Sequence, residues 1–279
     1  MNKKKIAIML NHTIAKAFRK ILHIYHTKIF SRIPGSIKYG SFLINLALLD
    51  IRKNSIPFRT ILDKDWDYLI LLDACRYDIL KEIMKRKIGY LISVGSNTFE
   101  WLKNTFKKEY YDIIYVSANP IVLYFIIKKC KGKTLFFHLE NVWKYGWDKK
   151  LNTVPPSKVT EVVLKLAKRF PRKKMIIHFL QPHPPFIGYK KYKYVSNIWR
   201  LFVEGKMSKE EFWAAYKSNL YLVMKEVRKL VKYLKGKVVL TADHGECFGE
   251  YGVYAHPSGV RIDELVKVPW IVLKDRRKK

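Results

Sequence analysis

The chain has 279 residues, and its 55 Lys and Arg against 23 Asp and Glu give a formal net charge of +32. Hydrophobic residues make up 49% of the sequence and aromatic residues 14%, which is enough for a sizeable core and excludes a largely disordered protein. The three cysteines, Cys75, Cys130 and Cys247, exclude a disulfide framework and a cysteine-rich structural zinc site.

Residues 1–60 form a basic leader with a break at Pro34-Gly35. In residues 3–29, apolar side chains recur at spacings of three and four, which predicts an amphipathic helix flanked by Lys and Arg. Such a helix can lie on an anionic membrane or pack against the rest of the chain, and both alternatives stay open. No apolar run approaches the roughly 18 residues of a membrane span, and no signal-peptide pattern occurs. We therefore expect a cytoplasmic protein, either soluble or held at a membrane surface through residues 1–30.

The positive charge indicates what kind of partner the protein has. A surplus of +32 favours anionic partners, such as phosphorylated substrates or anionic lipids. The sequence contains no zinc-finger, RNP-type or helix-turn-helix pattern. We therefore expect an anionic phosphorylated substrate and no specific nucleic acid.

From Asp67 onward, short apolar runs alternate with helical patterns. The expected strands cover residues 68–72, 91–94, 113–117, 134–137, 175–179, 238–241 and 270–273. The expected helices cover residues 77–87, 99–107, 157–169 and 209–234. Residues 68–72 and 238–241 are apolar throughout, as is typical of strands covered on both faces. The alternation predicts an α/β domain over residues 61–279, with a mainly parallel central sheet and helices on both faces.

Four of the expected strands run into polar segments, which contain Asp73, Thr98, His183 and the pair Asp243-His244. The carboxyl ends of parallel strands meet at one edge of a sheet, so we expect these side chains to lie close together. Two carboxylates and an imidazole suit a divalent cation such as Zn²⁺ or Mn²⁺. Taken singly, each residue has an ordinary explanation, such as a helix cap for Asp73 or a hydrogen-bonded core position for His244.

Thr98 is expected in the first turn of a helix, because Asn97 and Glu100 have the spacing of a capping box. The free N–H groups and partial positive charge of a helix N-terminus favour a bound phosphate. A neighbouring metal ion would lower the pKa of the hydroxyl and make it a nucleophile.

These motifs resemble those of the alkaline phosphatase/sulfatase superfamily, over roughly residues 67–273. The resemblance rests on Leu-Leu-Asp-Ala-Cys-Arg-Tyr-Asp at 71–78 and on Thr-Ala-Asp-His-Gly-Glu at 241–246 with the downstream His256. His-Pro-Pro-Phe at 183–186 is similar to the central His-x-Pro-aromatic loop of sulfatase-like proteins. The resemblance implies an alkaline phosphatase-like fold and a metal-dependent hydrolase or phosphotransferase.

The resemblance also implies roles for individual residues. The metal ligands would be Asp73, Thr98, Asp243 and His244, with Thr98 the metal-bound nucleophile. The transferred group or the leaving oxygen would be contacted by His183 and His256. Substrate contacts would come from Ser96, which is also the fallback nucleophile, and from Arg76 and Asn119.

The sequence departs from parts of the superfamily pattern. No Cys/Ser-x-Pro-x-Arg motif lies near Thr98, so formylglycine formation is not expected. Ala74 replaces the second acidic ligand, and no Asp-x-x-x-His pair lies between Thr98 and Asp243. This pattern is similar to single-metal phosphoglycerol and phosphoethanolamine transferases, although His256 leaves room for a second ion.

The leading hypothesis is a metal-dependent hydrolase or transferase that acts on phosphate esters of an anionic lipid, a glycan or a small molecule. The reaction would pass through a covalent intermediate on Thr98. The alternatives are a sulfatase or phosphonate hydrolase without formylglycine, and a non-catalytic protein of the same fold that binds a membrane surface.

Overall fold

The computed structural model describes residues 61–133, 135–195 and 197–275. The basic leader and its expected amphipathic helix lie outside the described residues, so its role and the expected domain boundary at residue 60 stay predictions. Within the described part of the chain, no helix combines the length and the apolar character needed to cross a bilayer.

The centre of the fold is a sheet of seven strands in the order β2-β9-β6-β1-β5-β3-β4. The strands are β1 Tyr68–Leu72, β2 Gly89–Ile92, β3 Tyr110–Ser117, β4 Phe136–Asn141, β5 Lys174–Phe179, β6 Val238–Thr241 and β9 Lys267–Lys274. The pairs from β6 across to β4 are parallel, whereas β9 is antiparallel to both β6 and β2. A separate hairpin joins β7 Cys247–Phe248 to β8 Tyr254–Ala255. The predicted α/β fold with a mainly parallel sheet is confirmed.

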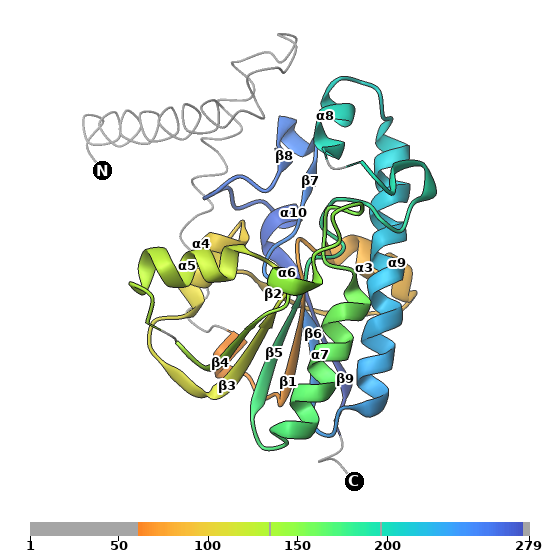
Figure 1. Ribbon diagram of the computed structural model, residues 1–279. Helices are drawn as coiled ribbons and strands as arrows, with labels where there is room; N and C mark the ends of the chain where they lie inside the picture. The colour runs from red at the N-terminus through yellow and green to blue at the C-terminus, as the bar shows by residue number, and fades with distance from the viewer. Residues whose placement is uncertain (1–60, 134, 196, 276–279) are drawn as a thin grey trace, which may run out of the picture.

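Helices cover both faces of this sheet (Figure 1). One face carries α3 Tyr77–Met84, α7 Pro156–Arg169 and α9 Lys209–Tyr233, and the other carries α4 Thr98–Thr105 and α5 Ile121–Lys129. The shorter helices are α6 Trp143–Gly146, α8 Ile198–Val203 and α10 Asp263–Val266, with 3-10 turns η2 Ile61–Asp63, η3 Lys190–Tyr192 and η4 Glu250–Gly252. Helix α5 was not among the expected helices.

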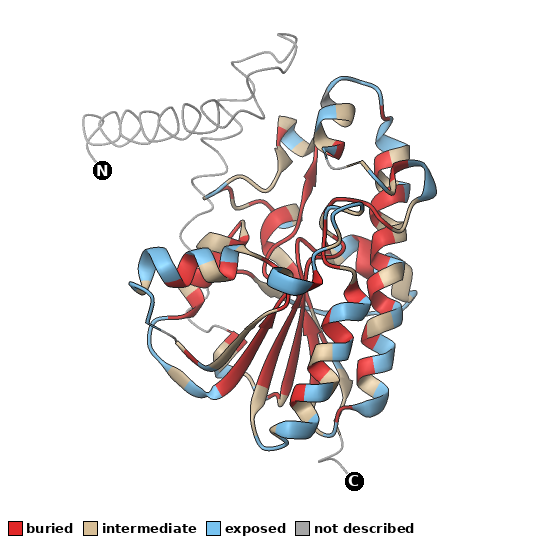
Figure 2. Cartoon of the chain, in the orientation of Figure 1, coloured by how far each residue is buried: buried red, intermediate tan, exposed pale blue. Residues whose placement is uncertain are grey.

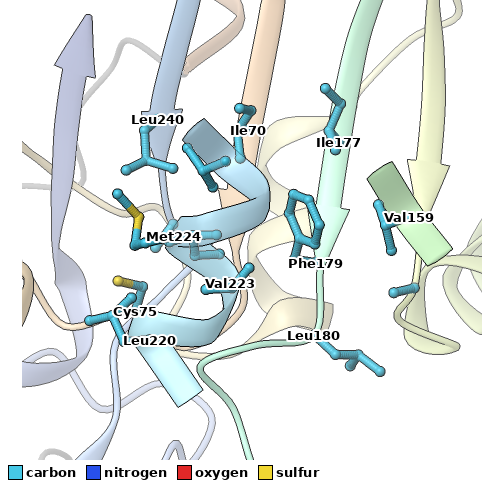
Figure 3. Packing of buried hydrophobic residues seen from close by; sticks show 14 of the residues in the cluster. Ile70, Cys75, Val159, Ile177, Phe179, Leu180, Leu220, Val223, Met224 and Leu240 are labelled. Atoms are coloured by element: carbon cyan, nitrogen blue, oxygen red, sulfur yellow. The ribbon is translucent and has the colours of Figure 1, made fainter. Parts of the chain in front are cut away.

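Buried side chains on both sheet faces hold the layers together, as the red strands of Figure 2 show. All five residues of β1 are buried. Leu69 and Leu71 pack on the side of α4 and α5, whereas Ile70 and Leu72 pack on the side of α7 and α9. Figure 3 shows Ile70 in the second of these clusters, together with residues of α9. Full burial of each large aliphatic side chain contributes about 1.5–3 kcal/mol to the stability of the fold. This burial holds the strands in their places in the sheet, and with them the loops that follow their carboxyl ends.

The direction of the strands places the candidate residues at one edge of the sheet. Strands β1, β3, β5 and β6 are mutually parallel, and β2 runs the same way because it and β6 are both antiparallel to β9. Their carboxyl ends therefore meet at a single edge, where ligands of open α/β sheets bind.

Candidate active site

Five of the predicted site residues come together at this edge. Asp73 directly follows β1, Asn119 lies two residues beyond β3, and Asp243 and His244 follow β6. Thr98 is the first residue of α4, which follows β2. All five side chains are buried. Segments that are far apart in the sequence thus form one polar cluster inside the fold.

Thr98 lies directly against the carboxylate of Asp243. Its hydroxyl donates to Asp243 Oδ2 at 2.8 Å and lies 3.3 Å from His244 Nε2. The backbone before it is held by Asn97, whose side chain accepts from Glu100 N at 2.9 Å. The return half of the capping box does not form, because the Glu100 carboxylate accepts from Ser96 N instead.

The hydroxyl of Ser96 has different partners from that of Thr98. Ser96 Oγ donates to the carbonyl oxygen of Pro257 at 2.8 Å and lies 2.9 Å from Glu100 Oε2. These contacts tie Ser96 to the segment around Pro257 and to Glu100. Of these two hydroxyls, it is Thr98 that the fold brings to Asp243.

Two carboxylates and two imidazoles form the centre of the site. The ligand atoms of Asp73, His178 and Asp243 all lie within 4.8 Å of one another. His178 Nε2 is 3.7 Å from Asp73 Oδ2 and 3.7 Å from Asp243 Oδ2. His244 Nε2 is 3.4 Å from Asp243 Oδ2 and 3.6 Å from Asp73 Oδ1.

His178 was missed in the sequence, although it carried a signal. It lies inside β5 between Ile177 and Phe179. A single polar side chain in a buried apolar strand is expected to have a hydrogen-bond partner or a ligand. Its Nδ1 is 2.9 Å from the hydroxyl of Tyr115, so that its Nε2 faces the aspartates. That buried Nε2 has no hydrogen-bond partner among the described residues.

The orientation of His244 likewise leaves one nitrogen free for a ligand. Its Nδ1 lies 2.7 Å from the carbonyl oxygen of Gly245, which assigns the proton to Nδ1 and the lone pair to Nε2. A Cβ at Gly245 would lie 2.0 Å from the carbonyl oxygen of Glu264, so the close approach of these two segments requires glycine. The donor set of the cluster therefore fits a divalent cation.

Burial dominates the electrostatics of the cluster. Burial and the carboxylate of Asp243 raise the pKa of Asp73 well above its usual range. Burial also acts to raise the pKa of Asp243, but the neighbouring His244 and His178 leave it below its usual value. Burial lowers the pKa of His244 and lowers that of His178 to about 4. Both imidazoles are therefore neutral near pH 7 and offer lone pairs.

A second cluster of potential ligands adjoins the first. His183, Glu246 and His256 have ligand atoms within 4.8 Å of one another. His256 Nδ1 is 2.8 Å from Glu246 Oε1, and the His256 ring centroid is 4.6 Å from that of His244. Burial lowers the pKa of His183 to about 4, and burial of His256 acts the same way but is outweighed by Glu246, which leaves its pKa raised. Glu246 was not singled out in the sequence, although it follows Asp243-His244 closely.

Of the two weaker substrate-binding candidates, the structure brings only Asn119 to the cluster. Asn119 Nδ2 donates to Asp73 Oδ2 and lies 3.4 Å from Thr98 Oγ1. Arg76 is buried, and its guanidinium donates to Asp78, to Glu250 and to the carbonyl oxygen of Glu246. These contacts make Arg76 a clamp between segments, and its expected contact with the substrate stays a prediction.

Comparisons with known proteins identify the fold. No protein-family model and no curated protein sequence matches the chain. The integral membrane protein lipooligosaccharide phosphoethanolamine transferase A from Neisseria meningitidis has a similar structure, with 14% identity, a TM-score of 0.50, and coverage of 95% of this chain and 59% of that chain.

Two further structures are less similar. The periplasmic domain of the phosphoethanolamine transferase EptC from Campylobacter jejuni has 16% identity, a TM-score of 0.46 and coverage of 76% of this chain and 79% of that chain. A protein in the alkaline phosphatase superfamily from Vibrio parahaemolyticus has 11% identity and a TM-score of 0.38, with coverage of 85% of this chain and 70% of that chain.

The comparisons correct one expectation and confirm another. The expectation of a cytoplasmic protein is wrong, because the similar structure that covers 95% of this chain is named an integral membrane protein. The implied fold is confirmed by the order of the strands and by the similarity over 95% of this chain. The chain therefore shares its α/β fold with this lipooligosaccharide phosphoethanolamine transferase A.

Proposed function

We propose that this protein is a metal-dependent enzyme that hydrolyses or transfers the phosphoryl group of a phosphate ester, with Thr98 as its nucleophile. The observation that carries the proposal is the position of the Thr98 hydroxyl, 2.8 Å from Asp243 Oδ2 and 3.3 Å from His244 Nε2. A scaffold protein has no need of a buried hydroxyl against two carboxylates and two neutral imidazoles. The proposed class agrees with the fold.

The residues that would hold the metal ion are Asp73, Asp243 and His244, with Thr98 beside them. The unpartnered Nε2 of His178 adds a fourth protein ligand that the sequence did not suggest. Zn²⁺ and Mn²⁺ both accept such mixed oxygen and nitrogen ligands. A bound divalent ion would lower the pKa of a hydroxyl and neutralise charge on a phosphoryl group. The cluster of His183, Glu246 and His256 offers ligands for a second ion.

The first step is attack by Thr98 Oγ1 on phosphorus. The proton of the Thr98 hydroxyl passes to Asp243 Oδ2, with which it already shares a hydrogen bond. A bond from Oγ1 to phosphorus forms while the bond from phosphorus to the leaving oxygen breaks, and the electron pair departs with that oxygen. The N-terminus of α4, where Thr98 sits, favours the negative charge of the phosphoryl group.

The histidines of the second cluster would serve the leaving group. We assign the proton that reaches the leaving oxygen to His256, whose Nδ1 pairs with Glu246, and contact with the phosphoryl oxygens to His183. Attack on phospho-Thr98 by water gives hydrolysis, and attack by an acceptor alcohol gives transfer. In either attack the incoming hydroxyl gives its proton to His256, the bond from phosphorus to Oγ1 breaks, and Asp243 returns its proton to Oγ1, which restores the Thr98 hydroxyl.

The substrate class follows from charge and from the named relatives of the fold. A chain with a net charge of +32 favours an anionic substrate. The similar membrane protein is named a lipooligosaccharide phosphoethanolamine transferase. We propose a phosphate ester carried by an anionic lipid or glycan as the substrate of this protein.

Substitution of the two hydroxyl residues tests the assignment of the nucleophile. Thr98→Ala should keep the fold and lose turnover of an activated aryl phosphate by several orders of magnitude, because a covalent nucleophile is removed. Ser96→Ala is the matched control and should lose far less. Thr98→Ser should keep part of the activity, because a primary hydroxyl can replace a secondary one.

Acid quench followed by phosphopeptide mapping identifies the residue that carries the phosphoryl group in the intermediate. The phosphoryl label should be found on Thr98. A label on Ser96, or full activity of Thr98→Ala, would show that the nucleophile is assigned wrongly. If the metal-loaded wild type turned over sulfate or phosphonate esters only, the substrate class would be wrong, and no turnover of any of these esters would favour a non-catalytic binding protein.

A further inference from the structure

Helix α5 carries apolar side chains on both of its faces. Val122, Phe125 and Ile126 are buried against the sheet. On the outer face, Tyr124 is 50% exposed and Ile127 is 56% exposed, with Ile121 at 37%. Residues three apart lie on the same side of a helix, so these three side chains form one outward stripe, here called the α5 stripe.

The other long helices have polar outer faces. The exposed side chains of α7 are Ser157, Lys158, Glu161, Lys165, Lys168 and Arg169. The exposed face of α9 is mostly charged and carries aromatic residues only as Tyr221 and Tyr233. Among the described helices of eight or more residues, α5 is the one that exposes isoleucines. Exposed apolar stripes of this kind mark interaction surfaces.

The charge around the α5 stripe is positive. No acidic residue occurs between Asn119 and Lys133. Exposed Lys128, Lys129, Lys131 and Lys133 follow at the end of the helix, and Lys128 Nζ lies 5.9 Å from the centre of the Tyr124 ring. An apolar stripe beside lysines complements a bilayer with anionic head groups. At about 1.5 Å per residue, a helix of this length is too short to span a bilayer and would lie in its surface.

The α5 stripe is tied to the candidate active site. Asn119 Oδ1 accepts from Ile121 N at 2.8 Å, while Nδ2 of the same carboxamide donates to Asp73. The ring of Phe99, the residue after Thr98, lies 5.8 Å from the ring of Tyr124 and 5.9 Å from that of Phe125. Helices α4 and α5 lie side by side (Figure 1), so a surface that holds α5 would also hold the segment that carries Thr98.

We propose that the α5 stripe docks on an anionic bilayer and holds the site at the level of the lipid head groups. The identity of the substrate as a lipid-borne phosphate ester rests on the proposed function, whereas the docking itself does not. The stripe supplies the apolar contact, and the four lysines supply attraction that salt weakens.

Two tyrosines give a matched test. Tyr124 on α5 is 50% exposed, and Tyr221 on α9, across the sheet, is 51% exposed. In the full chain, Tyr124→Glu should weaken binding to phosphatidylcholine vesicles that contain phosphatidylglycerol by several-fold, and Ile127→Glu by more. Tyr221→Glu should bind as the wild type does. Pure phosphatidylcholine vesicles should bind the wild type weakly, and added salt should weaken its binding to the anionic vesicles.

The comparison is made between variants whose thermal unfolding matches that of the wild type, with Ile127→Ser as the milder change. Any contribution from residues 1–60 is common to all variants, so equal binding by the Tyr124 and Tyr221 variants would overturn the proposal. If Tyr124→Glu instead altered the oligomeric state and left vesicle binding unchanged, the stripe would be an interface between copies.

A water-soluble aryl phosphate separates this proposal from the proposed function. Turnover of that ester should be the same in the Ile127 and Tyr221 variants as in the wild type. If none of them turned it over while the difference in vesicle binding persisted, the proposed activity would fail and the docking surface would stand.

Discussion

At the scale of single residues, the hydrogen bonds of Arg76 show a structural contribution that its motif did not indicate. Its Nε and Nη2 donate to the two oxygens of Asp78 at 3.0 and 2.7 Å. Its Nη1 donates to Glu250 Oε1 at 2.6 Å and to the carbonyl oxygen of Glu246 at 3.1 Å. The guanidinium carbon also lies 4.9 Å from the centre of the Phe248 ring. Arg76 therefore joins the segment after β1 to the hairpin after β6.

Removal of this clamp should destabilise the protein. Arg76→Ala should lower the free energy of unfolding by about 3 kcal/mol, because it removes the partner of Glu250 Oε1 and of the carbonyl oxygen of Glu246 in a largely buried place. Arg200→Ala is the matched control, since Arg200 pairs with Glu204 at 2.7 Å on the surface, and it should cost less than about 1 kcal/mol. Urea unfolding of both variants measures the difference, and equal losses would contradict the clamp.

At the scale of elements, α9 holds two loops of the candidate site, one that carries His183 and one that follows Asp73. The side chain of Asn219 accepts from Gly188 N at 3.0 Å and donates to the carbonyl oxygens of Pro182, His183 and Pro185 at 3.3, 3.2 and 3.0 Å. The hydroxyl of Tyr216 donates to the carbonyl oxygen of Ala74 at 2.7 Å, next to Asp73. The helix thus positions the site without contacting the reacting group.

Asn219→Asp should separate this positioning from simple packing. The carboxylate keeps the shape and the acceptor for Gly188 N but cannot donate to three carbonyl oxygens, so we expect a loss of at least about 2 kcal/mol of stability and reduced turnover. The matched control is Asn152→Asp, at an exposed turn, which should stay within about 0.5 kcal/mol of the wild type. Thermal unfolding and turnover at neutral pH check both variants. Wild-type stability of Asn219→Asp would refute this role.

At the scale of the whole molecule, the proposed metal site should couple the binding of a divalent ion to the stability of the fold. Two adjacent buried carboxylates repel each other, and a bound cation relieves that repulsion in the folded state alone. Purified protein should carry about one tightly bound divalent ion, and chelation should lower the thermal midpoint, which Zn²⁺ or Mn²⁺ should restore. Elemental analysis and thermal unfolding measure the two effects.

Variants at the site test the ligand assignment. Asp243→Ala should lose the ion, whereas Glu210→Ala, which removes an exposed carboxylate on α9, should keep it. An ion retained by Asp243→Ala, or by the double variant Asp73→Ala/His244→Ala, would refute the assignment. If a second ion of lower affinity is lost when His183 and His256 are replaced, that ion binds in the neighbouring cluster.

The sequence alone was enough to predict the layered architecture and most of the site. Runs such as 68–72 and 238–241 are apolar at every position, which identifies strands buried on both faces, and strands of one direction must end at one edge. Asp73, Asp243 and His244 could therefore be predicted to meet without knowledge of any contact. The capping spacing likewise placed Thr98 at a helix start, because that signal is local in the chain.

Only the tertiary structure decided the features that depend on which residues approach across the fold. The antiparallel pairing of β9 with β2, the contacts of Arg76 with Glu250 and the different partners of Thr98 and Ser96 all join segments more than a hundred residues apart. His178 is a further example. Its position inside an apolar strand does not indicate a ligand role by itself, and only the fold brings it next to Asp73 and Asp243. Local patterns fix the elements and their ends, whereas the partners of a side chain are set by how those elements pack.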